Sequence, residues 1–411
     1  MRKVVGRRSS IFELIAIIYI LLEPVLIMYG WANFNVATIL SYFLVLVFIY
    51  NSIRNNRNPL RSLPKFLSIY FVWLILCNYL SLGSLVPIGN IFVWLLFATL
   101  FSTISFDSLV RIYKVVAVLS ILLFAAQEVS YYTTGYRISG IIQWLPLSYA
   151  SQGIDVEKYL STRELINRSA SFFSEPAHFA QFLFPILAIS LFKANSLKSF
   201  IFPITIIVTL LLLQSGNALI GLICIGFVYT LKILNYRNMV YKLLVITVLF
   251  TGGVIGGYYY VNSSLGENLL DRKDSVSGEM DTSSGFFRIY RGYYVFDAYT
   301  PIEKIIGLNN FDKIKKRRDE SKVSFLVESE NDLYFNCFQH FLLRTGFIGA
   351  FLYILLCISL WRKNSYEGKA IILTFFALSF VASLYMSSVM MLYVYLSFAC
   401  KKMLGKDLVV L

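Results

Sequence analysis

Residues 11 to 30 read IFELIAIIYILLEPVLIMYG, and this stretch decides the fold. It carries only the charged side chains Glu13 and Glu23, and an apolar run of about 20 residues can cross a bilayer as one helix. The basic segment MRKVVGRRSS precedes it, as in a signal peptide. No small-residue cleavage site follows the apolar part, so we predict a retained first membrane span.

Similar apolar runs recur along the whole chain. Of its 411 residues, 57% are apolar and only 15% are charged, a balance that a water-exposed surface of this size would not tolerate. We therefore predict an all-α fold, a polytopic transmembrane helical bundle of about twelve spans with two long outer loops. The predicted spans are residues 11–29, 36–50, 66–82, 89–104, 112–131, 176–192, 199–213, 217–234, 240–260, 336–360, 369–386 and 388–402.

The predicted spans form three groups. Residues 1–130 hold the first five, residues 176–260 the next four, and residues 336–411 the last three with a cytoplasmic C-terminus. Between these groups lie a first long outer loop, residues 131–175, and a large outer loop, residues 261–335. The loops hold most of the soluble polar residues, so we expect any chemistry there.

Basic residues alternate between the ends of successive spans. Loops such as GWANFN and SLGSLVPIGN carry no Lys or Arg, whereas the intervening connections do. This pattern predicts that both termini face the cytoplasm and that both long loops face outward. The net charge of +14 is spread over short clusters rather than one basic face, so nucleic acid is not an expected partner.

The first outer loop enters the sixth span as RSASFFSEPAHFAQ, residues 168–181. Pro176 suits the first turn of a helix, which makes Glu175 its cap. The positive end of the helix dipole would then face outward beside Arg168 and His178, an arrangement suited to a diphosphate. The alternative is an ordinary capped helix entering the membrane.

The large outer loop contains FFRIYRGYYVF, in which Arg288 and Arg291 lie three residues apart among aromatic residues. The spacing indicates an amphipathic helix at the membrane surface, and Arg grips phosphate oxygens with two parallel bonds. The alternative is that both residues anchor the chain at lipid headgroups.

The same loop returns to the membrane through a polar segment. Asp332, Asn336, Gln339 and His340 share one face if the segment is helical, and polar side chains entering a span are costly unless they face a wet cavity. This stripe is a site candidate, with helix capping as the alternative. Glu23 and Glu128, near the outer halves of spans, rank below it.

The sequence gives little support for a metal site or a nucleotide-binding site. The five cysteines are scattered, only two histidines occur, and no phosphate-binding loop, dinucleotide fingerprint or outer Asp-x-Asp pair is present. We expect neither a metal nor a cofactor. An enzyme on the outer face lacks ATP and nucleotide sugars, so its substrate must arrive already activated by a lipid carrier.

Three patches carry a resemblance to a known family. They are RSASFFSEPAHFAQFL (168–183), SGFFRIYRGYYVFDAYTPIEKIIGLNNF (284–311) and ENDLYFNCFQHFLLRTGFIGAFLYILL (330–356). With the span count and the late outer loop, they resemble the Wzy-type polymerases of capsule and O-antigen synthesis, within the O-antigen polymerase and ligase superfamily. Ligases usually have a His where this chain has Glu330-Asn331-Asp332, which favours a polymerase and leaves the base unsettled.

The resemblance implies an enzyme of the bacterial plasma membrane that transfers a growing glycan from undecaprenyl diphosphate to a lipid-linked repeat unit. It implies Glu330 or Asp332 as base, with Glu175 as competitor. The diphosphates would be bound by Arg168, Arg288 and Arg291, with His178 giving a further proton or hydrogen bond.

The implied partners are the undecaprenyl-diphosphate-linked oligosaccharide, the lipid bilayer, a chain-length regulator and a repeat-unit flippase. An O-antigen-ligase-like glycan transferase and a transporter of lipid-linked sugars are the alternatives. A transporter usually shows repeated halves, and we find no internal repeat.

Overall fold

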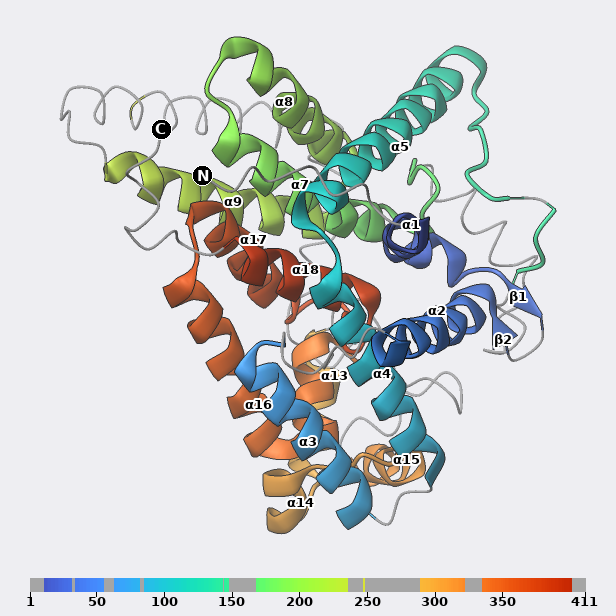
Figure 1. The fold of residues 1–411 in the computed structure, drawn as a ribbon, viewed down its shortest axis with the longest axis vertical. Helices are drawn as coiled ribbons and strands as arrows, with labels where there is room; N and C mark the ends of the chain where they lie inside the picture. The colour runs from blue at the N-terminus through green and yellow to red at the C-terminus, as the bar shows by residue number, and fades with distance from the viewer. Residues whose placement is uncertain are drawn as a thin grey trace. The chain divides into compact units, whose positions relative to one another are not determined.

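The regular structure of the computed structural model is helical, apart from one hairpin of two short strands, over the part of the chain that it describes (Figure 1). Contacts divide the chain into two compact units, Met1–Leu63 with Val93–Phe179, and Pro64–Phe92 with Ala180–Leu411. The described residues are 11–31, 34–54, 63–81, 85–142, 144–147, 168–235, 247, 289–321 and 335–400.

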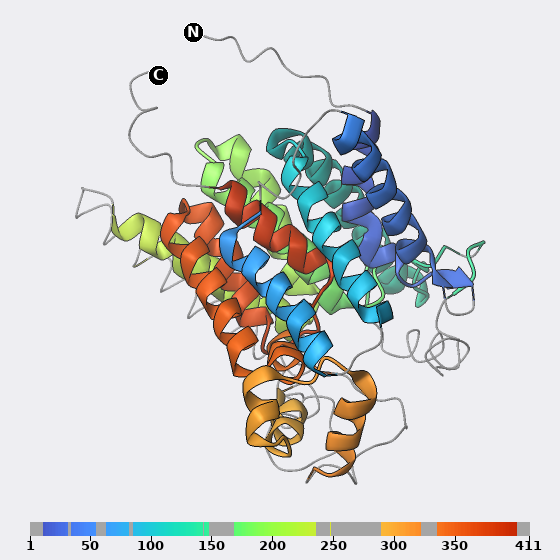
Figure 2. The same cartoon turned by 60° about the horizontal axis from the view of Figure 1, so that its bottom comes forward.

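The first unit contains a helical hairpin and one long helix. Helix α1 (Ile11–Leu26) and helix α2 (Val36–Arg54) are joined by strands β1 (Gly30–Trp31) and β2 (Phe34–Asn35) and lie side by side (Figure 2, dark blue). The buried Tyr19 hydroxyl donates to the Ala37 carbonyl at 2.7 Å and links the two helices.

The ends of α1 lie near the corresponding ends of α5 (Phe106–Thr134). Near the start of α1, the Glu13 carboxylate accepts from the Ser105 amide at 2.9 Å, directly before α5. Beyond the end of α1, the Tyr29 hydroxyl accepts from the Ile142 amide at 2.8 Å, in the segment after α5. The two helices therefore begin at one end of the unit and finish at the other.

The second unit is a larger bundle. Helix α3 (Lys65–Leu80) packs against α16 (Cys337–Lys363), and α17 (Tyr366–Leu378) packs against α9 (Gly216–Leu234) and α18 (Ser388–Ala399). Helix α8 (Leu197–Leu212) packs against α9. Two helices cross the boundary of the units along the chain, namely α4 (Leu85–Thr103) and α7 (Pro176–Lys193).

Three short helices form a helical cap, which we define as residues 289–321. They are α13 (Arg291–Asp297), α14 (Pro301–Ile306) and α15 (Phe311–Asp319), drawn in gold and light orange at one end of α16 and α3 (Figure 2). At the end of α3, the Ser81 carbonyl accepts from Lys313 at 2.7 Å and its hydroxyl accepts from the Asn309 amide at 3.3 Å. The cap is thus fixed to the end of the bundle.

An ion-pair network holds α14 to α15. Arg317 donates to Glu303 at 2.8 Å and to Glu320 at 2.6 Å. Burial of Glu303 opposes its ionisation, but hydrogen bonds from Arg317 and Thr300 outweigh burial and lower the pKa of this carboxyl group. The carboxylate of Glu303 also closes a capping box with Thr300 at the start of α14.

Helix α16 is broken at Gly346, which has φ +64°. The break directs backbone groups to other elements: the Leu343 carbonyl accepts from the Leu308 amide at 2.8 Å, and the Thr345 carbonyl accepts from the Trp73 ring at 3.0 Å. The Tyr299 hydroxyl also donates to the Leu343 carbonyl at 3.2 Å, and burial raises its pKa, which keeps it protonated as a donor.

The structure confirms the predicted membrane spans in part. By length and composition, five described helices could cross a membrane: α2, α5, α7, α9 and α16. Four shorter apolar helices, 10 to 17 residues long, accompany them within the described ranges. These helices fit an all-α, multi-pass membrane protein. The span predicted at 240–260 lies outside the described residues except for residue 247, and the count of about twelve stays a prediction.

One predicted span is longer than the helix that forms. Helix α17 ends at Leu378, whereas the apolar run predicts a helix to residue 386. The backbone from Ser379 to Ala382 instead accepts hydrogen bonds from the start of α16: Cys337 donates to Ala382 and Phe338 to Ser379, both at 2.8 Å. Tertiary hydrogen bonding therefore ends α17.

We expect Gly346→Ala and Gly307→Ala to destabilise the protein by about 3 kcal/mol or more, through steric overlap and left-handed backbone strain. A Cβ at Gly346 would lie 2.2 Å from the Ile305 oxygen, and one at Gly307, where φ is +80°, would lie 2.4 Å from the Thr345 nitrogen. Thermal unfolding of the detergent-purified protein measures the effect.

Gly226→Ala in α9 is the matched control, because a Cβ there meets nothing within 4 Å. Its unfolding temperature should stay at or above that of the wild type. Equal melting of the Gly346 and Gly226 variants would contradict the close backbone approach.

Candidate functional site

The segment from Arg168 to His178 leads into α7. Helix α7 begins at Pro176, and the Glu175 carbonyl accepts from the amides of His178 at 3.1 Å and Phe179 at 3.2 Å. Glu175 therefore holds the capping position that the sequence predicts. The exposed His178 ring lies beside it, with Nδ1 2.6 Å from the Ser174 hydroxyl.

Helix α5 fixes the backbone of this segment. The buried Gln127 side chain accepts from the Ser171 amide at 2.9 Å and donates to the Ser171 carbonyl at 3.1 Å. The Ser171 hydroxyl donates to the Ser120 carbonyl at 2.7 Å, and Ser171 itself has φ +55°. These bonds position the half-buried Arg168, three residues earlier, within the first unit.

In the second unit, Arg291 begins α13 and is only 1% exposed. Its guanidinium carbon lies 5.5 Å from the centre of the Phe335 ring. The next residue, Gly292, lets the backbone approach Gln339 so closely that a Cβ would lie 2.5 Å from its side chain. Such burial does not fit the alternative in which Arg291 anchors the chain at lipid headgroups.

Phe335 connects Arg291 to a second group of side chains. The His340 ring meets Phe335 edge-on at 5.7 Å and stacks on Tyr385 at 5.3 Å with an interplanar angle of 23°. Arg344, one turn further along α16, lies 5.6 Å over the same Tyr385 ring. We call these residues, together with Tyr70, the cation cluster.

Tyr70 completes the cluster from α3. Its hydroxyl is 2.9 Å from the Tyr385 hydroxyl, so the ring under both His340 and Arg344 is held in place. His340 Nδ1 and Arg344 Nε are buried and have no hydrogen-bond partner among the described residues. Buried polar atoms are normally satisfied, so these two indicate a place for water or for a polar ligand.

The polar stripe divides into capping and cluster residues. Asn336 is the N-cap of α16, with ψ 168°, and forms a capping box with Gln339. Helix α16 therefore begins after Asn336, and Asp332 lies outside the described residues. Gln339 Nε2 also donates to the Ile289 carbonyl at 2.8 Å, which fixes the start of the helical cap. Capping, the alternative reading, accounts for Asn336 and Gln339 but not for His340.

The structure places only some of the predicted site residues. Arg168, Glu175 and His178 belong to one segment of the first unit, and Arg291 belongs to the second unit. Arg288, Glu330 and Asp332 lie outside the described residues. Of the lower-ranked carboxylates, Glu128 pairs with Arg137 at 3.4 Å, and Glu23 is buried at 8% exposure in α1.

Sequence reasoning gave no role to Arg344, Tyr385 or Tyr70. Arg344 follows His340 by four residues, a helical spacing that could have placed both on one face. Tyr70 and Tyr385 lie in apolar runs without a local polar signal. No group of three or more His, Cys, Asp or Glu suited to a metal occurs in the described part of the chain.

Comparisons with known proteins do not place the chain in a family. No protein-family model matches it, and no curated protein sequence matches it. The functional argument therefore depends on the residues and the geometry above.

We predict that Gln127→Leu loosens the segment before α7, because it removes both bonds to Ser171 and leaves buried backbone groups unsatisfied, at a cost of about 2 to 4 kcal/mol. Hydrogen exchange of the amides from Ala170 to Ser174 should accelerate. Ser130→Ala on the same helix is the control, because its exposed hydroxyl bonds only locally, to Tyr136 at 2.7 Å. Unchanged exchange in Gln127→Leu would show that α5 does not hold the segment.

Proposed function

We propose that this protein is a membrane glycosyltransferase that polymerises undecaprenyl-diphosphate-linked oligosaccharide repeat units into a surface polysaccharide, such as capsule, O-antigen or exopolysaccharide. It would act at the outer face of the bacterial plasma membrane. The cation cluster is the observation that carries the proposal. Arg344 and His340 have buried polar atoms without partners among the described residues, and the buried Arg291 lies over the Phe335 ring that His340 also meets.

An anion is the ligand that suits such a cluster. A guanidinium is planar and always charged, and its donors match two phosphate oxygens at once. The stacked rings of His340 and Tyr385 remove water from one side, which strengthens the electrostatic attraction. A diphosphate on a lipid carrier would present this charge at a helix end within reach of the membrane.

The proposed reaction is a displacement at the anomeric carbon. The acceptor hydroxyl loses its proton to a base, and its oxygen bonds to the anomeric carbon of the donor glycan. The bond from this carbon to the diphosphate oxygen breaks, and the lipid diphosphate leaves with the electron pair. Arg291 and Arg344 would stabilise the charge that develops on the leaving group.

Several residues are candidates for the base that deprotonates the acceptor hydroxyl. Glu330 and Asp332 are preferred from the sequence, and Glu175 competes with them. His340 joins them, because a neutral imidazole can accept a proton and its Nδ1 has no partner in the described part of the chain. Arg168, Arg288 and His178 remain proposed diphosphate ligands.

Reconstitution tests the proposal directly. Purified protein in liposomes should convert lipid-linked repeat units into a ladder of products on a gel, without added nucleotide or metal. A single transferred species would indicate a ligase instead. Intact substrate that appears on the other side of the vesicle membrane would indicate a transporter.

Arg291→Lys and Arg344→Lys test the cation cluster. Lysine keeps the charge but loses the planar fork, so we expect polymer formation to fall on the order of 100-fold. The readout is polymer per amount of inserted protein, measured in the same liposomes.

Arg318→Lys is the matched control, because Arg318 is also buried in the helical cap, at 2% exposure, but bonds to Asp319. We expect this variant to fold like the other two and to keep normal polymer formation. A normal amount of polymer from the Arg344→Lys variant would contradict the proposal that the cation cluster binds the diphosphate.

A further inference from the structure

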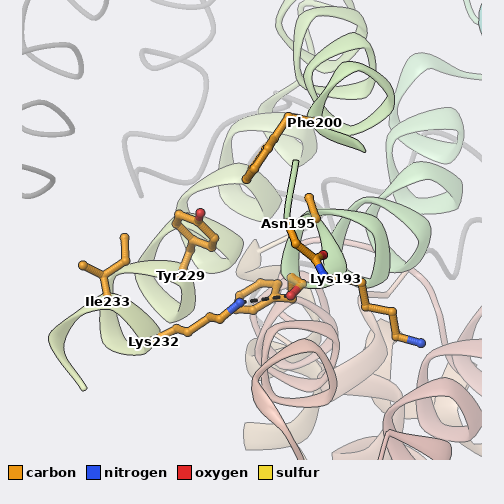
Figure 3. A pocket seen from close by; sticks show the side chains of 8 residues that line it. Lys193, Asn195, Phe200, Tyr229, Lys232 and Ile233 are labelled. Atoms are coloured by element: carbon orange, nitrogen blue, oxygen red, sulfur yellow. Dashed lines mark hydrogen bonds between the residues drawn. The ribbon is translucent and has the colours of Figure 1, made fainter. Parts of the chain in front are cut away.

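A cavity of about 660 Å³ lies at the opposite end of the second unit from the helical cap. The end of α7, the turn after it, the start of α8 and the end of α9 form its wall (Figure 3). Its volume is within the range of small-molecule sites. The lining residues are Phe192, Lys193, Ala194, Asn195, Phe200, Tyr229, Lys232 and Ile233.

Helix α17 separates the cavity from the cation cluster. Asn235, after α9, bonds to Tyr366 at the start of α17, and the residues after Leu378 bond to the start of α16. The 13 residues of α17 span about 20 Å, so the cavity is a distinct site.

Lys232 gives the cavity a fixed positive charge. Its ammonium donates to the Phe192 carbonyl at 3.0 Å and lies 5.5 Å from the Phe192 ring and 6.0 Å from the Tyr229 ring. An ammonium has three donors, and this carbonyl takes one of them. Figure 3 shows Lys232 extended along the wall, whereas the Lys193 ammonium points away from Phe200 and Tyr229.

The rest of the wall combines one polar side chain with aromatic rings. The Asn195 side chain is exposed in the turn between α7 and α8 and can donate through its amide. Phe200 and Tyr229 stand on α8 and α9. A ligand with a phosphate and an apolar part would use both kinds of surface.

Basic residues gather at this end of the unit. Lys193 ends α7, Lys198 begins α8, Arg362 and Lys363 end α16, and Lys369 follows the start of α17. The charge alternation predicts that this end faces the cytoplasm. Basic pockets between membrane helices on that side bind anionic lipid headgroups.

We propose that the cavity binds the phosphate of an anionic membrane lipid, with phosphatidylglycerol as the class of ligand. Lys232 and Asn195 contact the phosphate oxygens, and Phe200 and Tyr229 pack against the glycerol and the first carbons of the acyl chains. This site is independent of the proposed transfer reaction and would anchor α7, α8 and α9 to the inner leaflet.

Binding is measured by displacement of fluorescent phosphatidylglycerol from the purified full-length protein in neutral detergent. Short-chain phosphatidylglycerol should displace the probe, whereas phosphatidylcholine with the same chains and inorganic phosphate should not. Lys232→Gln should weaken binding about fivefold through the loss of one charge near the phosphate.

Two further variants keep the test decisive. Asn195→Asp is nearly isosteric in an exposed turn and should weaken binding by a similar factor through repulsion of the phosphate. Lys369→Gln is the control, because Lys369 also lies over aromatic rings at this end, 5.5 Å from Trp361 and 5.3 Å from Tyr366, but does not line the cavity. Its binding should equal that of the wild type.

Three outcomes would overturn the proposal. Equal displacement by phosphatidylcholine would mean that the acyl chains alone bind. Displacement by inorganic phosphate as effective as that by the lipid would assign the cavity to free phosphate. Wild-type affinity in both Lys232→Gln and Asn195→Asp would exclude the cavity as the lipid site.

Discussion

The arrangement of the second unit depends on how it satisfies the backbone where α16 is broken. Unpaired carbonyl groups are costly in apolar surroundings, so a broken helix needs donors from other elements. The Leu308 amide and the Trp73 ring supply them to Leu343 and Thr345. The same bonds hold the helical cap and α3 against the start of α16. The cap in turn places Arg291 over the Phe335 ring, whose edge also meets the His340 ring.

The cation cluster therefore combines groups from distant parts of the chain. Arg291 comes from the cap, His340 and Arg344 from α16, Tyr385 from the turn after α17 and Tyr70 from α3. The aromatic rings of Phe335 and Tyr385 lie against the guanidinium groups of Arg291 and Arg344 and limit their orientations. Preorganised charge of this kind costs little reorganisation when a negative group develops beside it.

Features with a local physical cause could be predicted from the sequence. Pro176 at the start of a helix fixes both the beginning of α7 and the capping position of Glu175. The apolar lengths predict most helices of the described ranges within a few residues. Features with a tertiary cause could not be predicted: α17 ends at Leu378 because its following carbonyls bond to α16, and Tyr385 becomes part of a site only through His340 and Arg344.

The length of the helices in the second unit determines how deep the cation cluster lies. Helix α3 has 16 residues and α17 has 13, so they rise about 24 Å and 20 Å, less than the hydrocarbon core of about 30 Å. The residues after α17 bond to the start of α16, and α3 contributes Tyr70 to the cluster from within its length. Either the bilayer thins around this unit or the cluster lies below the level of the lipid headgroups. In the second case, a charged lipid headgroup would reach the arginines only by descending into the helical bundle.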